Sequence, residues 1–263
     1  MRRIHAFEFN DLRWFPESFR NYGTNFLQFV SNAFDIYKCV MPVLEKGIRS
    51  SGNNTIVDIA SGGGGGLIKI SECLKKNVPH LQIILSDYYP NIQAFKKTKA
   101  KSPDVFEYVE GSVNATDVPL NLRGFRTQFL SFHHFRPKDA KAILQNAIDN
   151  NQPIGVFEAQ QRNFKDFILT LLSPISVLLF TPFIRPLSFK LIIFTYLIPV
   201  LPLITLWDGI VSVLRTYTVN ELKRMILEVR NSASFNWEVC VAKGSPNGIL
   251  YLLGIPCENN VSQ

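Results

Sequence analysis

The sequence predicts an α/β fold built on a doubly wound, mostly parallel sheet, and three observations lead to that class. Short apolar stretches typical of buried strands alternate with helical patterns between residues 55 and 158; such alternation indicates parallel βαβ units with right-handed crossovers. The first stretch runs through an acidic residue into five consecutive glycines, 62–66. Near the C-terminus, two strand-like stretches flank the turn sequence GSPNG, which predicts a hairpin whose last strand runs antiparallel to the others.

The composition predicts a folded protein with much apolar surface to hide. Of the 263 residues, 46% are hydrophobic and only 19% are charged, which argues against disorder. The formal net charge is +7, but the basic residues are scattered along the chain, so a nucleic-acid partner is not expected. Partners are instead sought among small or lipid-like molecules.

Cysteine usage and the N-terminal sequence predict a cytoplasmic setting. The four cysteines, at positions 39, 73, 240 and 257, include no CxxC pair, which argues against a zinc site or a redox motif. The opening sequence MRRIHAFEFNDLRWF lacks the apolar core of a secretory signal. We therefore expect the protein to remain in the reducing interior of the cell and predict no metal site.

The chain begins with a helical region of residues 1–50 that precedes the α/β domain of residues 51–263. Apolar residues recur at helical spacing from 24 to 48, before the sequence RSSGNN interrupts the pattern. Arginine and aromatic side chains precede this helix, as in residues Arg13 and Trp14. This composition would suit a lid that closes over a charged ligand.

The α/β domain then shows its elements in order. Helices are expected at 67–76, at 137–149, where a proline opens the helix, and at 218–229, where Thr218 and Glu221 form a capping box. Five parallel strands and the terminal hairpin together predict a sheet of seven strands. The expected strands are 55–60, 81–87, 106–112, 126–132, 152–158, 235–243 and 248–256.

An apolar helical insertion, 163–210, separates the fifth and sixth strands. Its central part, 167–207, is almost uncharged apart from Arg185 and Lys190. We interpret it as a two-helix hairpin that contacts a membrane or shields an apolar substrate. Its uncharged runs approach the lower limit of about 17–25 residues for a membrane span, but four prolines interrupt them and two charges stand at the bend. A lid or a surface-docking element is therefore favoured over a double span.

The glycine run indicates a turn at which backbone approaches a ligand. Glycine costs conformational entropy on folding, and its lack of a Cβ permits sharp turns and close approach. Backbone amides of residues 62–66 at the start of a helix can face a bound molecule, while Asp58 just before them can accept hydrogen bonds from a charged amino group.

These features resemble the class I S-adenosylmethionine-dependent methyltransferases. In that family an acid at the end of the first strand is followed by GxGxG; the sequence VDIASGGG places Asp58 at the acid, Ala60 at the first glycine, and Gly62 and Gly64 at the others. The resemblance covers 55–158 closely and 217–256 in outline. It implies a seven-stranded sheet of order 3-2-1-4-5-7-6 with strand 7 antiparallel, and S-adenosylmethionine as the cofactor.

The resemblance also implies which residues bind the cofactor. Asp87 occupies the place of an acid that accepts both ribose hydroxyls, with Tyr88 or Tyr89 against the adenine; as an alternative, Asp87 caps the helix that follows Pro90. Ser112 stands where the family often has an acid for the adenine amine. The full set of implied cofactor contacts is Asp58, Ala60, Ser61, Gly62, Gly63, Gly64, Asp87, Tyr88, Ser112, Val113, Ser131 and Phe132.

His133 and His134 are the candidate catalytic residues. They follow the fourth strand at the carboxyl edge of the sheet, where ligands bind in open α/β folds, and many small-molecule methyltransferases carry a similar pair there. An imidazole could remove a proton from the acceptor as the methyl group is transferred. Alternatively, the pair lines the cofactor pocket or caps the helix after Pro137.

The sequence therefore predicts methyl transfer to an unidentified, small or hydrophobic acceptor. One alternative is a non-catalytic, membrane-docked protein on the same scaffold, since fold does not determine function. A nicotinamide-dependent oxidoreductase is a further alternative, although no frame of the glycine run supplies all three glycines of GxGxxG directly after the strand. If the insertion docks on a membrane, the protein is peripheral on its cytoplasmic face.

Overall fold

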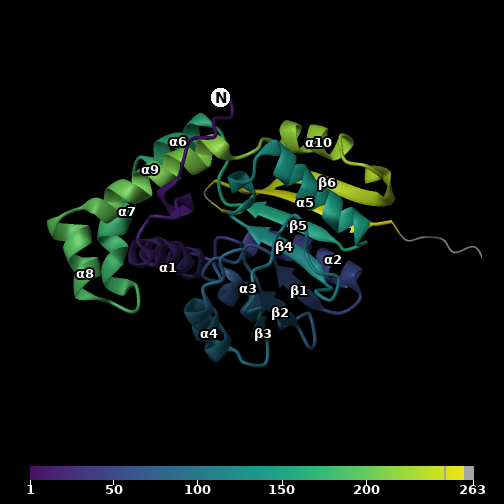
Figure 1. The fold of residues 1–263 in the computed structure, drawn as a ribbon, viewed down its shortest axis with the longest axis horizontal. Helices are drawn as coiled ribbons and strands as arrows, with labels where there is room; N and C mark the ends of the chain where they lie inside the picture. The colour runs from purple at the N-terminus through teal and green to yellow at the C-terminus, as the bar shows by residue number, and fades with distance from the viewer. Residues whose placement is uncertain (246, 258–263) are drawn as a thin grey trace, which may run out of the picture.

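The computed structural model describes residues 1–245 and 247–257, and its centre is a seven-stranded sheet (Figure 1). The strand order is β3-β2-β1-β4-β5-β7-β6, and β7 is antiparallel to both neighbours while the other pairs are parallel. The predicted order is thus confirmed. The strands are β1 (Thr55–Asp58), β2 (Gln82–Leu85), β3 (Phe106–Tyr108), β4 (Phe125–Phe129), β5 (Ile154–Glu158), β6 (Phe235–Ala242) and β7 (Ile249–Pro256).

Alternating side chains of the strands form two cores, one on each face of the sheet. On β1, Ile56 packs on one face and Val57 on the other. One face is covered by α2 (Met41–Ser51), α3 (Leu67–Leu74) and α4 (Ile92–Lys101), and the opposite face by α5 (Pro137–Asp149) and α10 (Val219–Leu227). A strand buried on both faces reads as a continuous apolar run, which explains why these strands could be recognised from sequence.

Local signals at the element ends are also reproduced. The capping box of Thr218 and Glu221 starts α10, and Pro137 is in the first turn of α5. Gly52 ends α2 in the left-handed region with φ 72°. Of the predicted turn at 244–248, residue 246 lies outside the described residues.

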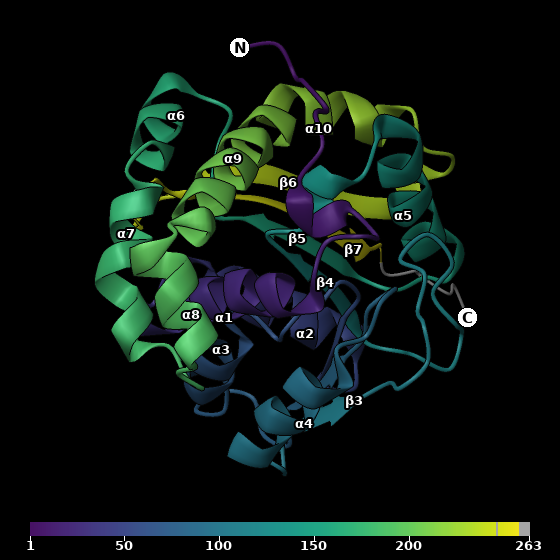
Figure 2. The same cartoon turned by 60° about the vertical axis from the view of Figure 1, so that its left-hand side comes forward.

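The N-terminal region contains two helices with different places in the molecule. α1 (Glu17–Ala33) lies beside the insertion and over the loop that follows β1, whereas α2 covers the sheet (Figure 2). Asp35, with φ 48°, and a short 3-10 turn at Lys38–Val40 separate them. Only α1 and the extended chain before it are therefore placed where a lid would be; the lid itself stays a prediction.

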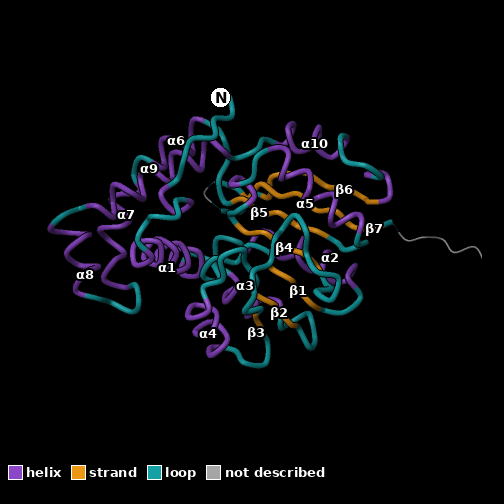
Figure 3. Tube along the Cα trace, viewed as in Figure 1, coloured by secondary structure: helices purple, strands orange, loops and turns teal. Residues whose placement is uncertain are grey.

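The insertion forms two arms, and each arm is broken. Its helices are α6 (Phe164–Thr170), α7 (Ser173–Phe180), α8 (Phe189–Ile192) and α9 (Val200–Arg215) (Figure 3). The predicted two-helix hairpin is wrong in this respect, because Pro174 begins a new helix and Pro199 stands directly before α9. Within the described residues no single helix has the length and apolarity to cross a membrane, while two pairs, bent by 42° and 75°, meet both criteria only when joined.

Candidate cofactor and acceptor site

The glycine loop, residues 59–66, connects β1 to α3 at the carboxyl edge of the sheet. Gly62 and Gly64 have φ values of 55° and 90°, a region that disfavours residues with a Cβ. Gly63 is constrained by space instead, because a Cβ there would lie 2.4 Å from Thr24 Cγ2 on α1. The glycines thus serve both the turn and the close approach of α1.

Asp58 ends β1 and is buried beneath this loop. Its Oδ1 accepts a hydrogen bond of 2.8 Å from Thr127 Oγ1 on the adjacent strand β4. Burial raises the pKa of the Asp58 carboxyl to about 7, although hydrogen bonds from Ser61 and Thr127 oppose this shift. The group therefore titrates close to neutral pH.

Asp87 follows β2 and lies across the glycine loop. Its Oδ2 accepts from the backbone N–H of Gly62 at 2.9 Å, and its Oδ1 accepts from that of Tyr89 at 2.9 Å. Burial raises its pKa. The helix-cap alternative is wrong, because Asn91 caps α4 by accepting from the Ala94 N–H.

Asp58 and Asp87 form an acidic site beside the glycine loop. In the part of the chain that the structure describes, neither carboxylate makes an ion pair. Burial raises the pKa of Asp58, and repulsion from Asp87 adds to this shift, whereas His134 acts to lower the pKa of Asp87. Two partly desolvated acids beside backbone amides favour a ligand that carries positive charge near the loop. A pyrophosphate would meet repulsion here.

Of the other implied cofactor contacts, Ser61 lies within the glycine loop, whereas Tyr88 and Ser112 lie next to Asp87. Ser61 Oγ donates to the Asp58 carbonyl at 3.0 Å, next to Ala60. Tyr88 is exposed and meets Tyr89 edge to face at 4.8 Å between ring centroids, and Ser112 Oγ donates to the Tyr88 carbonyl at 2.7 Å. The structure thus brings Tyr88, Asp87 and Ser112 to one edge.

Three of the implied contacts are largely enclosed. Val113 donates its backbone N–H to the Asp87 carbonyl at 2.9 Å, but its side chain belongs to a core. Phe132 is 1% exposed and packs on Tyr217 in that same core. Ser131 is buried with a hydroxyl that has no hydrogen-bond partner, and it remains the one of the three with a polar atom to offer.

His133 lies just beyond β4 and is held by the last residue of β5. Glu158 accepts from the His133 backbone N–H at 3.0 Å and contacts its Nδ1 at 2.9 Å. Because an ionised carboxylate only accepts, this contact favours the tautomer of a neutral His133 in which Nδ1 carries the proton and Nε2 the lone pair. The imidazole is 2% exposed, and among the described residues Nε2 finds no hydrogen-bond partner. Glu158 therefore orients His133 as an acceptor of protons through Nε2.

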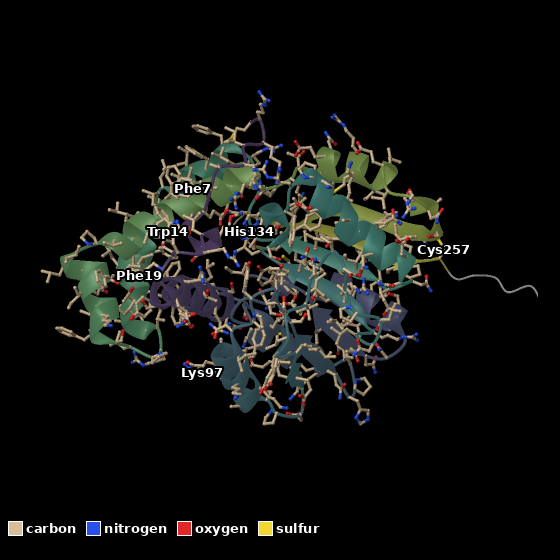
Figure 4. All side chains as sticks on the ribbon, in the orientation of Figure 1. Phe7, Trp14, Phe19, Lys97, His134 and Cys257 are labelled. Carbon is tan, nitrogen blue, oxygen red and sulfur yellow. The ribbon has the colours of Figure 1, made fainter. Side chains whose placement is uncertain are left out.

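The N-terminal arm, residues 1–11, covers both histidines. Glu8 Oε1 lies 3.8 Å from His133 Nε2, and Asp11 Oδ1 lies 3.0 Å from His134 Nδ1. The buried Arg215 at the end of α9 pairs with both acids, at 3.1 Å and 2.6 Å. Figure 4 places His134 between the arm and the sheet. The arm thus closes over the histidine pair through a network of buried charges.

The charge network alters the titration of His134. Burial disfavours the imidazolium, but Glu8 and Asp11 outweigh burial and raise its pKa to about 9. In turn, a hydrogen bond from His134 lowers the pKa of Asp11 against the effect of burial. His134 is therefore a cation at neutral pH and is held as one half of an ion pair, which leaves His133 as the better candidate base.

Glu8, His133 and His134 also meet the spacing of a metal site, with ligand atoms within 4.8 Å of one another. Arg215 Nη1, however, lies 3.1 Å from Glu8 Oε1 and 3.3 Å from His134 Nδ1. A guanidinium thus already supplies the positive charge at this point, and the arrangement is better described as an ion-pair network.

Sequence reasoning missed Glu8, Asp11, Glu158 and Arg215. Glu158 had a usable signal, since it ends a predicted strand next to the one that carries the histidines. The other three gave none, because Glu8 and Asp11 lie about 200 residues from Arg215 along the chain and meet it only through folding.

A small apolar pocket of about 10 Å³ lies between α1 and the insertion. Its lining includes Phe26 from α1 together with Val177, Ile184, Leu191 and Leu201, and Tyr22 and Ser188 join hydroxyls across its edge at 2.9 Å. A pocket with these walls favours an apolar group over a polar one.

No family model matches the chain, and no curated protein matches its sequence. The fold, however, is found among solved structures. The pyocyanin biosynthetic protein PhzM is similar with a TM-score of 0.55 at 12% identity, over 95% of this chain and 62% of PhzM. The chain therefore spans less than two thirds of that protein.

Two further likenesses are weaker. Human N-acetylserotonin methyltransferase, solved with S-adenosylmethionine, has a TM-score of 0.47 at 12% identity over 88% of this chain and 55% of its own. The methyltransferase domain of bacterial CtHen1-CN has a TM-score of 0.49 at 12% identity over 84% and 99%. Sheet order and the PhzM likeness give this chain the class I S-adenosylmethionine-dependent methyltransferase fold.

Proposed function

We propose that this protein binds S-adenosylmethionine at the glycine loop and transfers its methyl group to a hydrophobic acceptor. The observation that carries the proposal is the pair of unpaired carboxylates, Asp58 and Asp87, on either side of loop amides. S-adenosylmethionine carries a sulfonium and an ammonium group, so its charge complements this site. The neighbours of this fold that bind S-adenosylmethionine add support only as distant likenesses.

The chain's own groups suit the cofactor in position as well as in charge. Asp87 has two oxygens that each accept only one backbone hydrogen bond, so each retains a lone pair for a ribose hydroxyl. Asp58, just beneath the loop, is proposed to accept hydrogen bonds from the cofactor's amino group. When bound, the cofactor supplies an activated methyl group attached to a good leaving group.

His133 is proposed as the base that takes the acceptor's proton at Nε2, while Glu158 holds its Nδ1–H. Alignment contributes much of the rate in such a displacement, and general base catalysis typically contributes a further factor of about 100 to 10,000. For an acceptor to reach Nε2, Glu8 must move with the N-terminal arm. The predicted lid therefore corresponds to this arm and α1.

A hydrophobic acceptor is supported by the apolar insertion that packs beside α1 and exposes many large hydrophobic side chains. Which atom of the acceptor is methylated is not proposed. An acceptor of this class is best sought in an organic-solvent extract of cells, incubated with the protein and cofactor labelled in its methyl group.

Titration calorimetry tests the cofactor. We expect saturable binding of S-adenosylmethionine and of its demethylated product, and none of NAD. Saturation with NAD in the absence of S-adenosylmethionine binding would overturn the proposal in favour of an oxidoreductase. If neither ligand gives heat of binding, the result would favour a non-catalytic scaffold. The closed N-terminal arm supports this second candidate, because Glu8 Oε1 lies 3.8 Å from His133 Nε2 and so stands where an acceptor would have to approach.

A matched pair of variants tests the base. His133→Asn should lower methyl incorporation by about 100-fold or more, while cofactor affinity stays within twofold. Lys97→Asn, at an exposed position of α4, is the control and should change neither methyl incorporation nor cofactor affinity. Loss of cofactor affinity in His133→Asn would instead assign His133 to the lining of the cofactor site.

A further inference from the structure

The insertion presents most of the exposed apolar surface of this protein. Of the 27 exposed large hydrophobic side chains among the described residues, 17 lie between positions 164 and 207. That segment is about a sixth of the chain. Monomeric soluble proteins rarely expose contiguous patches of this kind without a partner. The surface therefore requires an occupant.

Exposure extends around the helices of the insertion instead of following one stripe. Leu178 and Leu179 of α7 are both exposed, as are Ile168 and Leu169 of α6. Neighbouring residues of a helix point about 100° apart, so their joint exposure means that more than one side of an arm faces outward. A flat protein partner covers one side, whereas lipid can surround several.

The charges of the insertion have one sign at its surface. Between 163 and 207 the sole acid is Asp166, which is 1% exposed, while Arg185 and Lys190 are exposed on and beside the connection between the two arms. A second copy of this surface would bring further cations and no exposed acid to meet them. An anionic lipid headgroup layer meets both requirements, apolar contact and negative charge.

The N-terminal arm continues the same surface. The Phe7 ring packs on Trp207 at 5.3 Å between centroids, and Trp207 Nε1 donates to the Phe7 carbonyl at 3.0 Å. Phe7 is 48% exposed, and Trp14, which follows the arm, is 71% exposed; Figure 4 labels both. Tryptophan is enriched at the level of lipid headgroups.

We propose that the insertion, together with Phe7 and Trp14, docks on an anionic membrane surface. The broken arms lie within the interface, with Arg185 and Lys190 among the lipid phosphates and the apolar side chains among the upper acyl chains. The bends of 42° and 75° are compatible with arms that follow the interface. Docking is independent of cofactor binding, and it stands if the proposed methyl transfer fails.

Vesicle flotation without any cofactor tests the proposal. The protein should float with vesicles of phosphatidylcholine and phosphatidylglycerol, and much less with phosphatidylcholine alone. Since each basic residue near an anionic surface contributes about a fivefold factor in affinity, Arg185→Gln with Lys190→Gln should weaken binding about 25-fold. The paired control Lys96→Gln with Lys97→Gln, on α4, should leave binding unchanged.

A second pair of variants tests the apolar contact. Phe189 and Leu197 are each 77% exposed, so Phe189→Ser with Leu197→Ser should preserve thermal melting but weaken binding to the anionic vesicles at least tenfold. Equal binding to neutral vesicles, or no effect of the charge variant, would overturn the docking proposal. Two other results would also overturn it. Bound protein that resists extraction with alkaline carbonate would indicate a membrane span. A dimer in light scattering that the Phe189→Ser, Leu197→Ser variant dissociates would indicate that a second copy covers the surface.

Discussion

The buried carboxyl of Asp58 should make cofactor affinity depend on pH near neutrality. Its pKa of about 7 means that about one carboxyl in ten is ionised at pH 6 and about nine in ten at pH 8. A cationic ligand binds the ionised form. The affinity for S-adenosylmethionine should therefore rise about tenfold between these two pH values, or about 1.4 kcal/mol.

Asp58→Asn isolates this effect from every other titration. An asparagine oxygen can still accept the hydrogen bond from Thr127 Oγ1 that holds the side chain at 2.8 Å. The variant should bind the cofactor at pH 8 with lower affinity than the wild type. Its affinity should change little between pH 6 and pH 8, because the titrating group is gone.

The measurement is calorimetric titration at pH 6, 7 and 8 in buffers of matched ionic strength, with circular dichroism to confirm that both proteins stay folded. The demethylated product serves as a second ligand, since it lacks the sulfonium charge. An equal pH dependence in the wild type and in Asp58→Asn would refute the reasoning, because it would assign the titration to the ligand or to another residue.

Two further predictions concern stability. Gly63→Ala should lower the free energy of unfolding by about 1–3 kcal/mol, since its Cβ would lie 2.4 Å from Thr24 Cγ2; Thr24→Ser removes that methyl group and should restore stability in the double variant. Urea unfolding measures the stability of the single and the double variant. If the double variant is as unstable as Gly63→Ala, the loss of stability comes from the loop backbone and not from the contact with Thr24. His134, whose pKa is raised to about 9 chiefly by Glu8 and Asp11 against burial, should add stability that is fully present below about pH 6.5 and lost as pH rises through 9. The contribution of His134 to the free energy of unfolding is at most about 3 kcal/mol, and solvent reduces it because the side chain is partly exposed. A His134→Gln variant that loses stability over the same pH range with the same slope would contradict this assignment.

Much of the fold could be predicted because its signals are local. Strands such as β1 and β5 are continuous apolar runs, and their alternation with helices limits the possible topologies to a few. The hairpin of β6 and β7 follows from a short turn, which forces antiparallel pairing. The capping box of α10 is likewise contained in four residues.

The helical insertion shows where local signals are incomplete. The composition of 167–207 correctly predicts helical and exposed apolar structure, and its prolines predict breaks. How far each arm bends depends on packing against α1, through contacts such as that of Phe19 with Phe194 at 4.9 Å between ring centroids. Those contacts join residues 175 positions apart, so no sequence window contains them.

The sequence by itself determined the sheet, the glycine loop and the positions of Asp58, Asp87 and the histidine pair at one edge, because strand order brings the carboxyl ends of parallel strands together. Only the tertiary structure decided what surrounds the histidines. Glu8 and Arg215 are 207 residues apart in sequence, and their pairing over His133 requires the N-terminal arm to pack on α9. The physical reason is that periodicity and turn propensity act between near neighbours, whereas a buried charge is placed by whichever distant segment compensates for its lost hydration.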